Sequence, residues 1–166
     1  MAVVTVKSTQ ITNRDAVPAV FSTAVQGTPI EHARGVCAIA NGDSVASKFI
    51  ACSVPSNAIV LSVRASAPDI GITTAADVGL YRTTADGGAV VSVAFFASAQ
   101  ALNAGPYLKT ELSQESGTYT IANMEKPLWQ ALGLTKDPQV MYDVVATLTG
   151  AADAAGNILL EVDYTV

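Results

Sequence analysis

Two stretches near the C-terminus alternate strictly between apolar and other side chains, and they constrain the fold more than any other feature. The apolar positions are Val140, Tyr142, Val144, Ala146 and Leu148 in the first stretch, and Ile158, Leu160, Val162, Tyr164 and Val166 in the second. A period of two places successive side chains on opposite faces of a β-strand. Each stretch therefore predicts a strand with one face in a core, and the GAADAAGN between them predicts a hairpin turn.

The chain from about Gly35 onward continues this pattern of strands and turns. Asn41-Gly42-Asp43 separates two apolar runs, and Asn-Gly is a strong hairpin signal. Ile59, Leu61 and Val63 alternate with polar or smaller residues, which predicts a strand that buries those three side chains. A further strand is expected over 76–83, and a helical turn near 95–100. The fold class indicated is all-β, an antiparallel β-sandwich.

One short helix is expected, over residues 126–133. Pro127 stands near its start and Gly133 just past its end, the usual asymmetry of helix termini. Leu128, Trp129 and Leu132 fall on one face of this helix. We therefore expect it to plug the end of the sandwich, with Trp129 as its anchor.

The first 33 residues differ from the rest and are interpreted as an extended N-terminal arm, with the sandwich domain over 34–166. Prolines and glycines interrupt the arm, and proline cannot donate a hydrogen bond to a sheet ladder. Its apolar side chains follow neither a helical nor a strand period. An irregular apolar arm must be buried on its own domain or on a neighbour, so the predicted contact residues are Val17, Val20, Phe21 and Val25.

Charge and composition exclude several classes of partner. The net charge is −5 and the sequence pI is about 4.6, which argues against nucleic acid and against anionic membranes. Apolar runs such as 58–61 are far shorter than the ~20 residues of a membrane span. No secretory signal is recognised at the start, so the protein is expected to be made and used in a cytoplasm, or carried out of it as part of something larger. Only 14% of residues are charged, so either a partner covers part of the surface or Ser and Thr replace charge there.

Cys37 and Cys52 each lie in a strand-like run. Neighbouring strands would bring them within bonding reach, but without an export signal two buried thiols are the favoured interpretation. These cysteines and the single histidine, His32, do not form a recognisable four-ligand zinc site. His32 itself is expected to be an ordinary loop residue.

The stretch DVGLYRTTADGGAVV, residues 77–91, combines an arginine with an Asp-Gly-Gly that resembles a phosphate cradle. Such a cradle requires glycines that lead into a helix, followed by lysine, and here a β-like run follows instead. We interpret the stretch as two strands and their turn, with Gly79 marking a bulge or a close backbone approach.

No enzyme is predicted. Asp143 and Glu161 are expected to be neighbouring surface carboxylates without an aromatic sugar platform. Asp153 and Asn157 lack the spacing of a calcium loop. His32 is the sole candidate base for a serine, and no G-x-S-x-G motif accompanies it. We therefore expect no catalytic, cofactor-binding or metal-binding site.

Four stretches together resemble a family of small tailed-phage virion proteins, regarded as head decoration or cement proteins. These are VPSNAIVLSVRASAPD, DVGLYRTTADGGAVV, TYTIANMEKPLWQALGLTKDP and NILLEVDYTV, so the resemblance runs from about Val54 to Val166 and does not cover the arm. It implies a jelly-roll-like sandwich on the outside of a capsid, made in the cytoplasm of a host bacterium, with the major capsid protein as partner. It transfers no functional residue.

Shell symmetry favours a homo-oligomer, and a trimer in particular, for a protein of this kind. The alternative function is a tail or head-fibre module that recognises a host glycan. That function requires exposed aromatic side chains, for which Tyr81, Tyr107, Tyr119 and Trp129 are the candidates.

Overall fold

The computed structural model describes residues 16, 18, 28–103 and 107–166, and nearly all regular structure in them is β. The strands are β1 (Glu31–Ile39), β2 (Lys48–Pro55), β3 (Ile59–Ala67), β4 (Ala75–Arg82), β5 (Val90–Ala101), β6 (Tyr107–Glu111), β7 (Met141–Leu148) and β8 (Gly156–Thr165). Three short helical pieces accompany them: η1 (Thr84–Asp86), η2 (Ile121–Asn123) and α2 (Leu128–Ala131). The predicted all-β class is confirmed.

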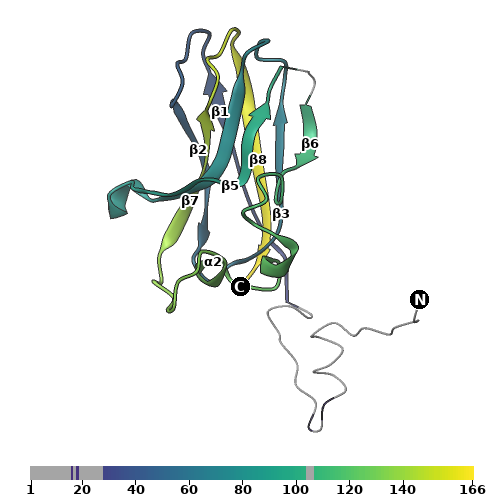
Figure 1. The fold of residues 1–166 in the computed structure, drawn as a ribbon, viewed down its shortest axis with the longest axis vertical. Coiled ribbons are helices and arrows are strands. Elements are labelled where there is room, and N and C mark those ends of the chain that lie inside the picture. Colours follow the sequence, from purple (N-terminus) through teal and green to yellow (C-terminus); the bar gives the residue numbers. More distant parts are fainter. Residues whose placement is uncertain (1–15, 17, 19–27, 104–106) are drawn as a thin grey trace, which may run out of the picture.

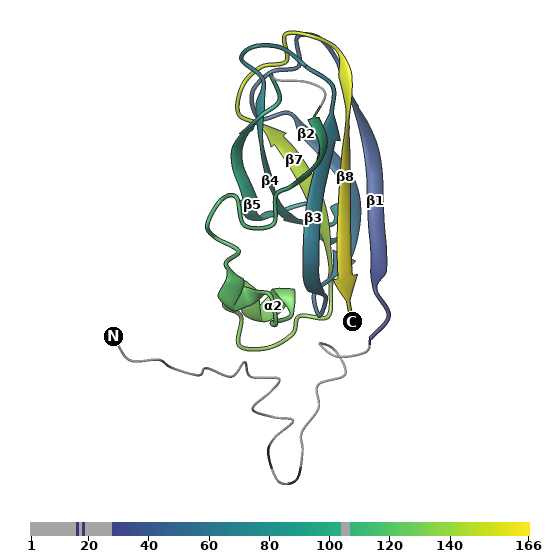
Figure 2. The same cartoon turned by 90° about the vertical axis from the view of Figure 1, so that its right-hand side faces the viewer.

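The strands form two four-stranded antiparallel sheets, in the orders β1-β8-β3-β6 and β2-β7-β4-β5 (Figure 1). Figure 2 shows the two sheets as separate layers. Consecutive strands alternate between the layers, except β4 and β5, which pair within one sheet. Most connections between consecutive strands therefore cross from one sheet to the other.

Two predicted hairpins are wrong for this reason. β1 pairs with β8 and β2 pairs with β7, so the turn at Asn41-Gly42 crosses between sheets. β7 and β8 likewise lie in different sheets, and residues 149–155 cross between them. Gly42 does adopt the left-handed backbone that such a turn requires, at φ 89°. A backbone hydrogen bond from Gly42 to Ala152, at 2.8 Å, ties the two crossings together.

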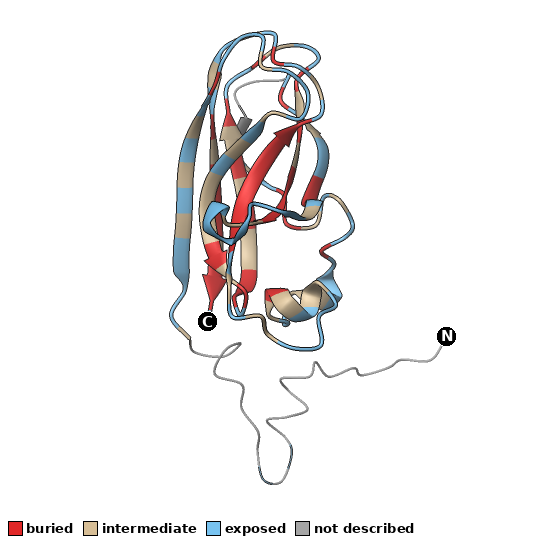
Figure 3. Cartoon of the chain, turned by 90° about the vertical axis from the view of Figure 1, so that its left-hand side faces the viewer, coloured by how far each residue is buried: buried red, intermediate tan, exposed pale blue. Residues whose placement is uncertain are grey.

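The core lies between the layers, and buried residues lie mainly along the strands (Figure 3). The alternating positions of β7 and β8 face it as predicted, except Val166, which lies past the end of β8 and is 46% exposed. Phe95 and Phe96 belong to β5, so the helical turn expected near 95–100 is wrong. The two phenylalanine rings lie 5.0 Å apart between centroids, and each lies 5.5 Å from the Tyr119 ring.

A β-bulge changes the predicted faces of β3. The register against β8 shifts between Val60 and Ser62, so two consecutive residues lie on the outer side. Val60 and Val63 consequently face the core, whereas Leu61 stays outside the core cluster. The simple alternation of Ile59, Leu61 and Val63 is therefore wrong.

The stretch 77–91 forms a hairpin, as predicted. β4 and β5 pair around η1, and Gly87 and Gly88 take positive φ angles of 84° and 63° in the turn. Gly79 lies at a register shift, where an added Cβ would be 2.1 Å from the Ser92 carbonyl oxygen and 2.2 Å from that of Val93. Both the bulge and the close backbone approach inferred from the sequence are thus present.

The plug helix is a single turn, α2, and it closes one end of the sandwich (Figures 1 and 2). Its backbone N–H groups at Leu128 and Trp129 donate to Ala58 and Ser56 in the β2–β3 turn, at 2.8 and 3.0 Å. Leu128 is fully buried whereas Trp129 is only partly buried, so the anchor is Leu128 and not Trp129. Within the described residues, no helix is long and apolar enough to cross a membrane.

β1 begins at Glu31, inside the range 1–33 that the sequence indicated as an arm. The predicted contact residues Val17, Val20, Phe21 and Val25 lie outside the described residues.

Candidate functional site

His32 lies in strand β1 and not in a loop, which corrects the sequence-based expectation. It is in register with Asp163 of β8, and its Nδ1 is 2.6 Å from an Asp163 carboxylate oxygen. The other oxygen of Asp163 accepts hydrogen bonds from the Ser62 hydroxyl at 3.0 Å and from Arg64 at 2.7 Å. Four polar side chains from three adjacent strands thus meet on the outer face of one sheet.

This cluster contains a histidine, a carboxylate and a serine, but their order does not match a catalytic triad. A triad places histidine between the acid and the nucleophile, so that the imidazole takes the hydroxyl proton. Here His32 and Ser62 both bind Asp163, and His32 Nε2 lies 3.8 Å from Glu161 instead. Burial raises the pKa of Asp163, but hydrogen bonds from His32 and Ser62 and the charge of Arg64 outweigh it and lower that pKa overall. The geometry is that of a structural charge cluster.

Glu161 and Asp143 are not the neighbouring surface pair expected from the sequence. Their strands belong to different sheets, and the two residues are only 4% and 7% exposed. Glu161 lies beneath cationic side chains, with Lys109 Nζ at 3.5 Å and Arg64 Nε at 3.9 Å. Asp143 accepts a hydrogen bond of 2.5 Å from Ser53. Opposite outer faces of the sandwich cannot form a glycosidase carboxylate pair.

The candidate metal ligands have structural roles. In the part of the chain that the structure describes, no group of three or more His, Cys, Asp or Glu side chains is placed to hold a metal ion. Asp153 accepts hydrogen bonds from the Thr73 hydroxyl at 2.8 Å and the Thr73 N–H at 3.1 Å. Both bonds lower the pKa of Asp153. The ionised carboxylate thereby holds the crossing at residues 149–155 to the β3–β4 connection.

Cys37 and Cys52 are both free thiols. Cys37 donates to the Ile50 carbonyl at 3.2 Å, where the edge strands β1 and β2 of the two sheets meet. Burial, followed by the charges of Asp143 and Cys37, raises the pKa of Cys52 to about 12. Burial also raises the pKa of Cys37. Since the thiolate is the reactive form, neither thiol suits nucleophilic chemistry.

The end of the sandwich that carries α2 presents exposed apolar side chains. We call this surface the base and define it by Ile30, Ile121, Leu134, Met141 and Val166. Their elements meet there: β1 and β7 begin, β8 ends, and η2 leads into α2 (Figures 1 and 2). A hollow of about 320 Å³ opens between residues 55–57 and 137–141 at the same end. Scattered exposed apolar residues are ordinary, and other described strands and crossings expose Val36, Val45, Ile50, Ile72, Val90 and Val93. The five that share one end make the base a candidate interaction surface.

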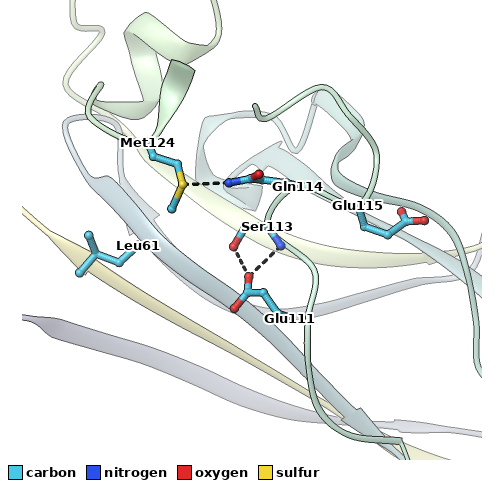
Figure 4. Close-up of a pocket in the computed structure, with 6 residues that line it drawn as sticks. All are labelled: Leu61, Glu111, Ser113, Gln114, Glu115 and Met124. Atoms are coloured by element: carbon cyan, nitrogen blue, oxygen red, sulfur yellow. Dashed lines mark hydrogen bonds between the residues drawn. The ribbon is translucent and has the colours of Figure 1, made fainter. Parts of the chain in front are cut away.

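A second hollow, which we call the groove, lies on the flank of the sandwich (Figure 4). Its volume is about 530 Å³, and its lining consists of Leu61, Glu111, Ser113, Gln114, Glu115 and Met124. One oxygen of Glu111 accepts hydrogen bonds from the backbone N–H groups of Val63 and Ser113, at 3.2 and 2.9 Å, and from the Ser113 hydroxyl. Sequence reasoning missed this site because its residues come from separate segments with no shared motif.

Two of the predicted sugar-binding aromatics are inside the protein. Tyr81 is buried, with its hydroxyl 2.9 Å from that of Thr147, and Tyr119 is buried with its hydroxyl donating to Val60 at 2.9 Å. Trp129 is partly buried, and the side chain of Tyr107 is outside the described residues. An exposed aromatic platform therefore cannot include Tyr81 or Tyr119.

The described residues form a β-sandwich with an exposed apolar end, two hollows and structural charge clusters. No protein-family model matches the chain, and no curated protein matches it. Among solved structures, a chain of the cyanophage Pam1 capsid asymmetric unit is similar, with a TM-score of 0.55 and 18% sequence identity. The match covers 84% of this chain and 86% of that one, so it shows a shared fold over most of both.

Proposed function

We propose that this chain is a structural protein of a phage virion that binds the outside of the assembled capsid and stabilises it. The observation that carries the proposal is the fold shared with a chain of the cyanophage Pam1 capsid asymmetric unit. The partner is the major capsid protein lattice, and the chain acts as a non-enzymatic binding module. A protein that binds the assembled lattice better than free subunits stabilises the shell by mass action.

We further infer that the sandwich is a jelly roll. Its strand orders, β1-β8-β3-β6 and β2-β7-β4-β5, alternate between two four-stranded sheets. Eight strands in two sheets with two Greek keys are the arrangement of that fold. This assignment agrees with a virion role, but the same fold serves lectins and enzymes and therefore does not carry the function.

The base is the surface that we assign to the shell. It groups exposed apolar side chains at the end where β1 begins, which is where the preceding arm joins the sandwich. The arm, residues 1–33, supplies further apolar contacts to the lattice or to neighbouring copies through Val17, Val20, Phe21 and Val25. Copies of the chain associate as a homo-oligomer, a trimer at lattice three-folds being favoured by symmetry.

Recognition of a host glycan by a tail or head fibre is less well supported. The burial of Tyr81 and Tyr119 removes two of the aromatic side chains that a sugar would stack on. Binding of the isolated protein to a glycan array would favour this alternative.

The deciding experiment is quantitative mass spectrometry of purified particles of the phage that encodes the chain. Near-stoichiometric abundance relative to the major capsid protein is expected on the capsid exterior. A few copies per particle would point to a tail or fibre, and absence from the particle would refute the proposal.

Deletion of residues 1–25 tests the arm separately. The truncated protein is expected to bind purified shells more weakly than the full chain, measured by co-sedimentation. Unchanged affinity would show that the arm does not contribute to shell binding, and it would leave the proposed role of the base untouched.

A further inference from the structure

We propose that the groove binds the chain's own N-terminal stretch Lys7–Arg14. The groove lies where the edge strand of one sheet stops short. β6 pairs with β3 only at Arg64, Ala65 and Ala67, and the chain then turns away after Glu111. Val63 still accepts a backbone hydrogen bond from Leu112 at 2.7 Å, but β3 before Val63 has no strand partner on that side, and the groove opens there beside Leu61.

The groove combines apolar and acidic side chains in fixed positions. Leu61 and Met124 supply the apolar part, and the Gln114 amide donates to the Met124 sulfur at 2.8 Å (Figure 4). Glu111 and Glu115 supply two carboxylates, and none of the lining residues that the structure describes is basic. Such a site selects an apolar side chain with cations close by.

The two carboxylates are held by the backbone through one oxygen each. Glu111 uses Oε1 for its three hydrogen bonds, and Glu115 uses Oε2 to accept the Ser98 N–H at 2.7 Å. Neither second oxygen has a hydrogen-bond partner within residues 28–103 and 107–166. Each carboxylate is thus oriented in advance and keeps an acceptor for an incoming cation.

The N-terminal stretch carries the complementary chemistry. In the 27 residues before Thr28 the basic residues are Lys7 and Arg14, and they bracket one large apolar side chain, Ile11. In the bound state Ile11 packs against Leu61 and Met124, and the two cations pair with the glutamates. The 14 residues from Arg14 to Thr28 span up to ~46 Å when extended, which allows binding within one copy or between neighbours.

The test is photo-crosslinking in the full-length protein, without shells. A benzophenone amino acid replaces Ile11, and the crosslinked peptides are identified by mass spectrometry. Crosslinks to Leu61, Met124 or residues 111–115 are expected. Crosslinks confined to other surfaces, or none, would overturn the proposal. The same probe at Ile72, which is 84% exposed and lies in a chain crossing at the other end, is the matched control.

Charge substitutions provide the second arm of the test. Glu115→Gln, and Lys7→Gln with Arg14→Gln, are each expected to lower the Ile11 crosslink yield about three- to fivefold, the scale of an exposed ion pair. Asp86→Asn, a carboxylate on the β4–β5 hairpin, is expected to leave the yield unchanged. Equal yields in all variants would refute the charge pairing on which the assignment to Lys7–Arg14 rests.

Mixing isotopically heavy and light chains identifies the donor copy. Heavy–light crosslinks place the segment in a neighbour's groove, and crosslinks within one isotope place it in its own; either result supports the groove as the receptor. Because shells are absent, failure here leaves the proposed capsid role untouched.

Discussion

Single side chains on the outer sheet faces are more buried than their sequence positions suggest. Glu161 and Asp163 alternate with core residues of β8, and Glu161 was expected at the surface, yet cross-strand neighbours largely cover Glu161. His32, Ser62 and Arg64 supply Asp163 with hydrogen bonds from both adjacent strands. The alternation in β8 predicted which way these carboxylates point, but not their cover, because the covering side chains come from strands distant in sequence.

Asp163→Asn tests this cluster through its pH dependence. The folded-state pKa of Asp163 is lowered, so its ionised form contributes stability that is present above the ordinary pKa near 4 and is lost as pH falls through the lowered value. We expect the substitution to reduce the free energy of unfolding by about 1 kcal/mol at pH 7, and by less at pH 3. Urea unfolding at both pH values measures the difference. An equal loss at both would contradict an electrostatic role, and Asp86→Asn serves as the exposed control.

Gly79→Ala tests the close approach between β4 and β5. The added Cβ would overlap the backbone carbonyl oxygens of Ser92 and Val93, which cannot move without disturbing the hairpin. We expect a loss of about 2–4 kcal/mol in thermal or urea unfolding. Gly42→Ala is the control, because that residue has positive φ but a Cβ added there would meet no neighbouring atom within 4 Å, and its expected cost is about 1 kcal/mol. Similar losses for the two variants would argue against steric overlap at Gly79.

At the scale of elements, strand positions were more predictable than strand partners. The period of two located β7 and β8, and the glycines located the β4–β5 turn. The same alternation suits any neighbouring strand, however, so it did not reveal that β7 and β8 lie in different sheets. The Asn41-Gly42 signal identified a turn correctly but not its partners, because the ladder groups of β1 are paired with β8. The groove could not be predicted for a related reason, since its lining combines β3 with the end of β6 and the chain that follows it.

Leu128→Ala tests the role of α2 as a plug. Leu128 is fully buried in the core cluster, and the single turn around it is fixed by backbone bonds to the β2–β3 turn. Removing its side chain leaves a cavity, with an expected loss of about 2–4 kcal/mol. Leu134→Ala, at an exposed site just beyond the same helix, is expected to cost less than about 1 kcal/mol. Comparable losses measured by urea unfolding would show that the helix does not close the core.

At the scale of the whole molecule, the two ends of the sandwich differ in chemistry. The end opposite the base carries Asp43, Asp69 and Asp153, which accept backbone hydrogen bonds from Ala40, Gly71 and Thr73 within the crossings. Val45 and Ile72 are exposed at that end as well, but the base groups five exposed apolar side chains around α2. For the proposed capsid role we therefore expect the base to face the shell and the end with these aspartates to face solvent.

A pair of matched substitutions tests that orientation. Ile121 on the base and Ile72 at the acidic end are 76% and 84% exposed, so aspartate at either site should change the free energy of unfolding by less than about 0.5 kcal/mol. We expect Ile121→Asp to weaken binding to purified shells about tenfold, equivalent to ~1.4 kcal/mol, because it places a charge in an apolar contact. Ile72→Asp should bind like the parent chain. If only Ile72→Asp weakens binding in a co-sedimentation titration, the opposite end of the molecule faces the shell. If neither substitution weakens binding, the base is not part of the interface.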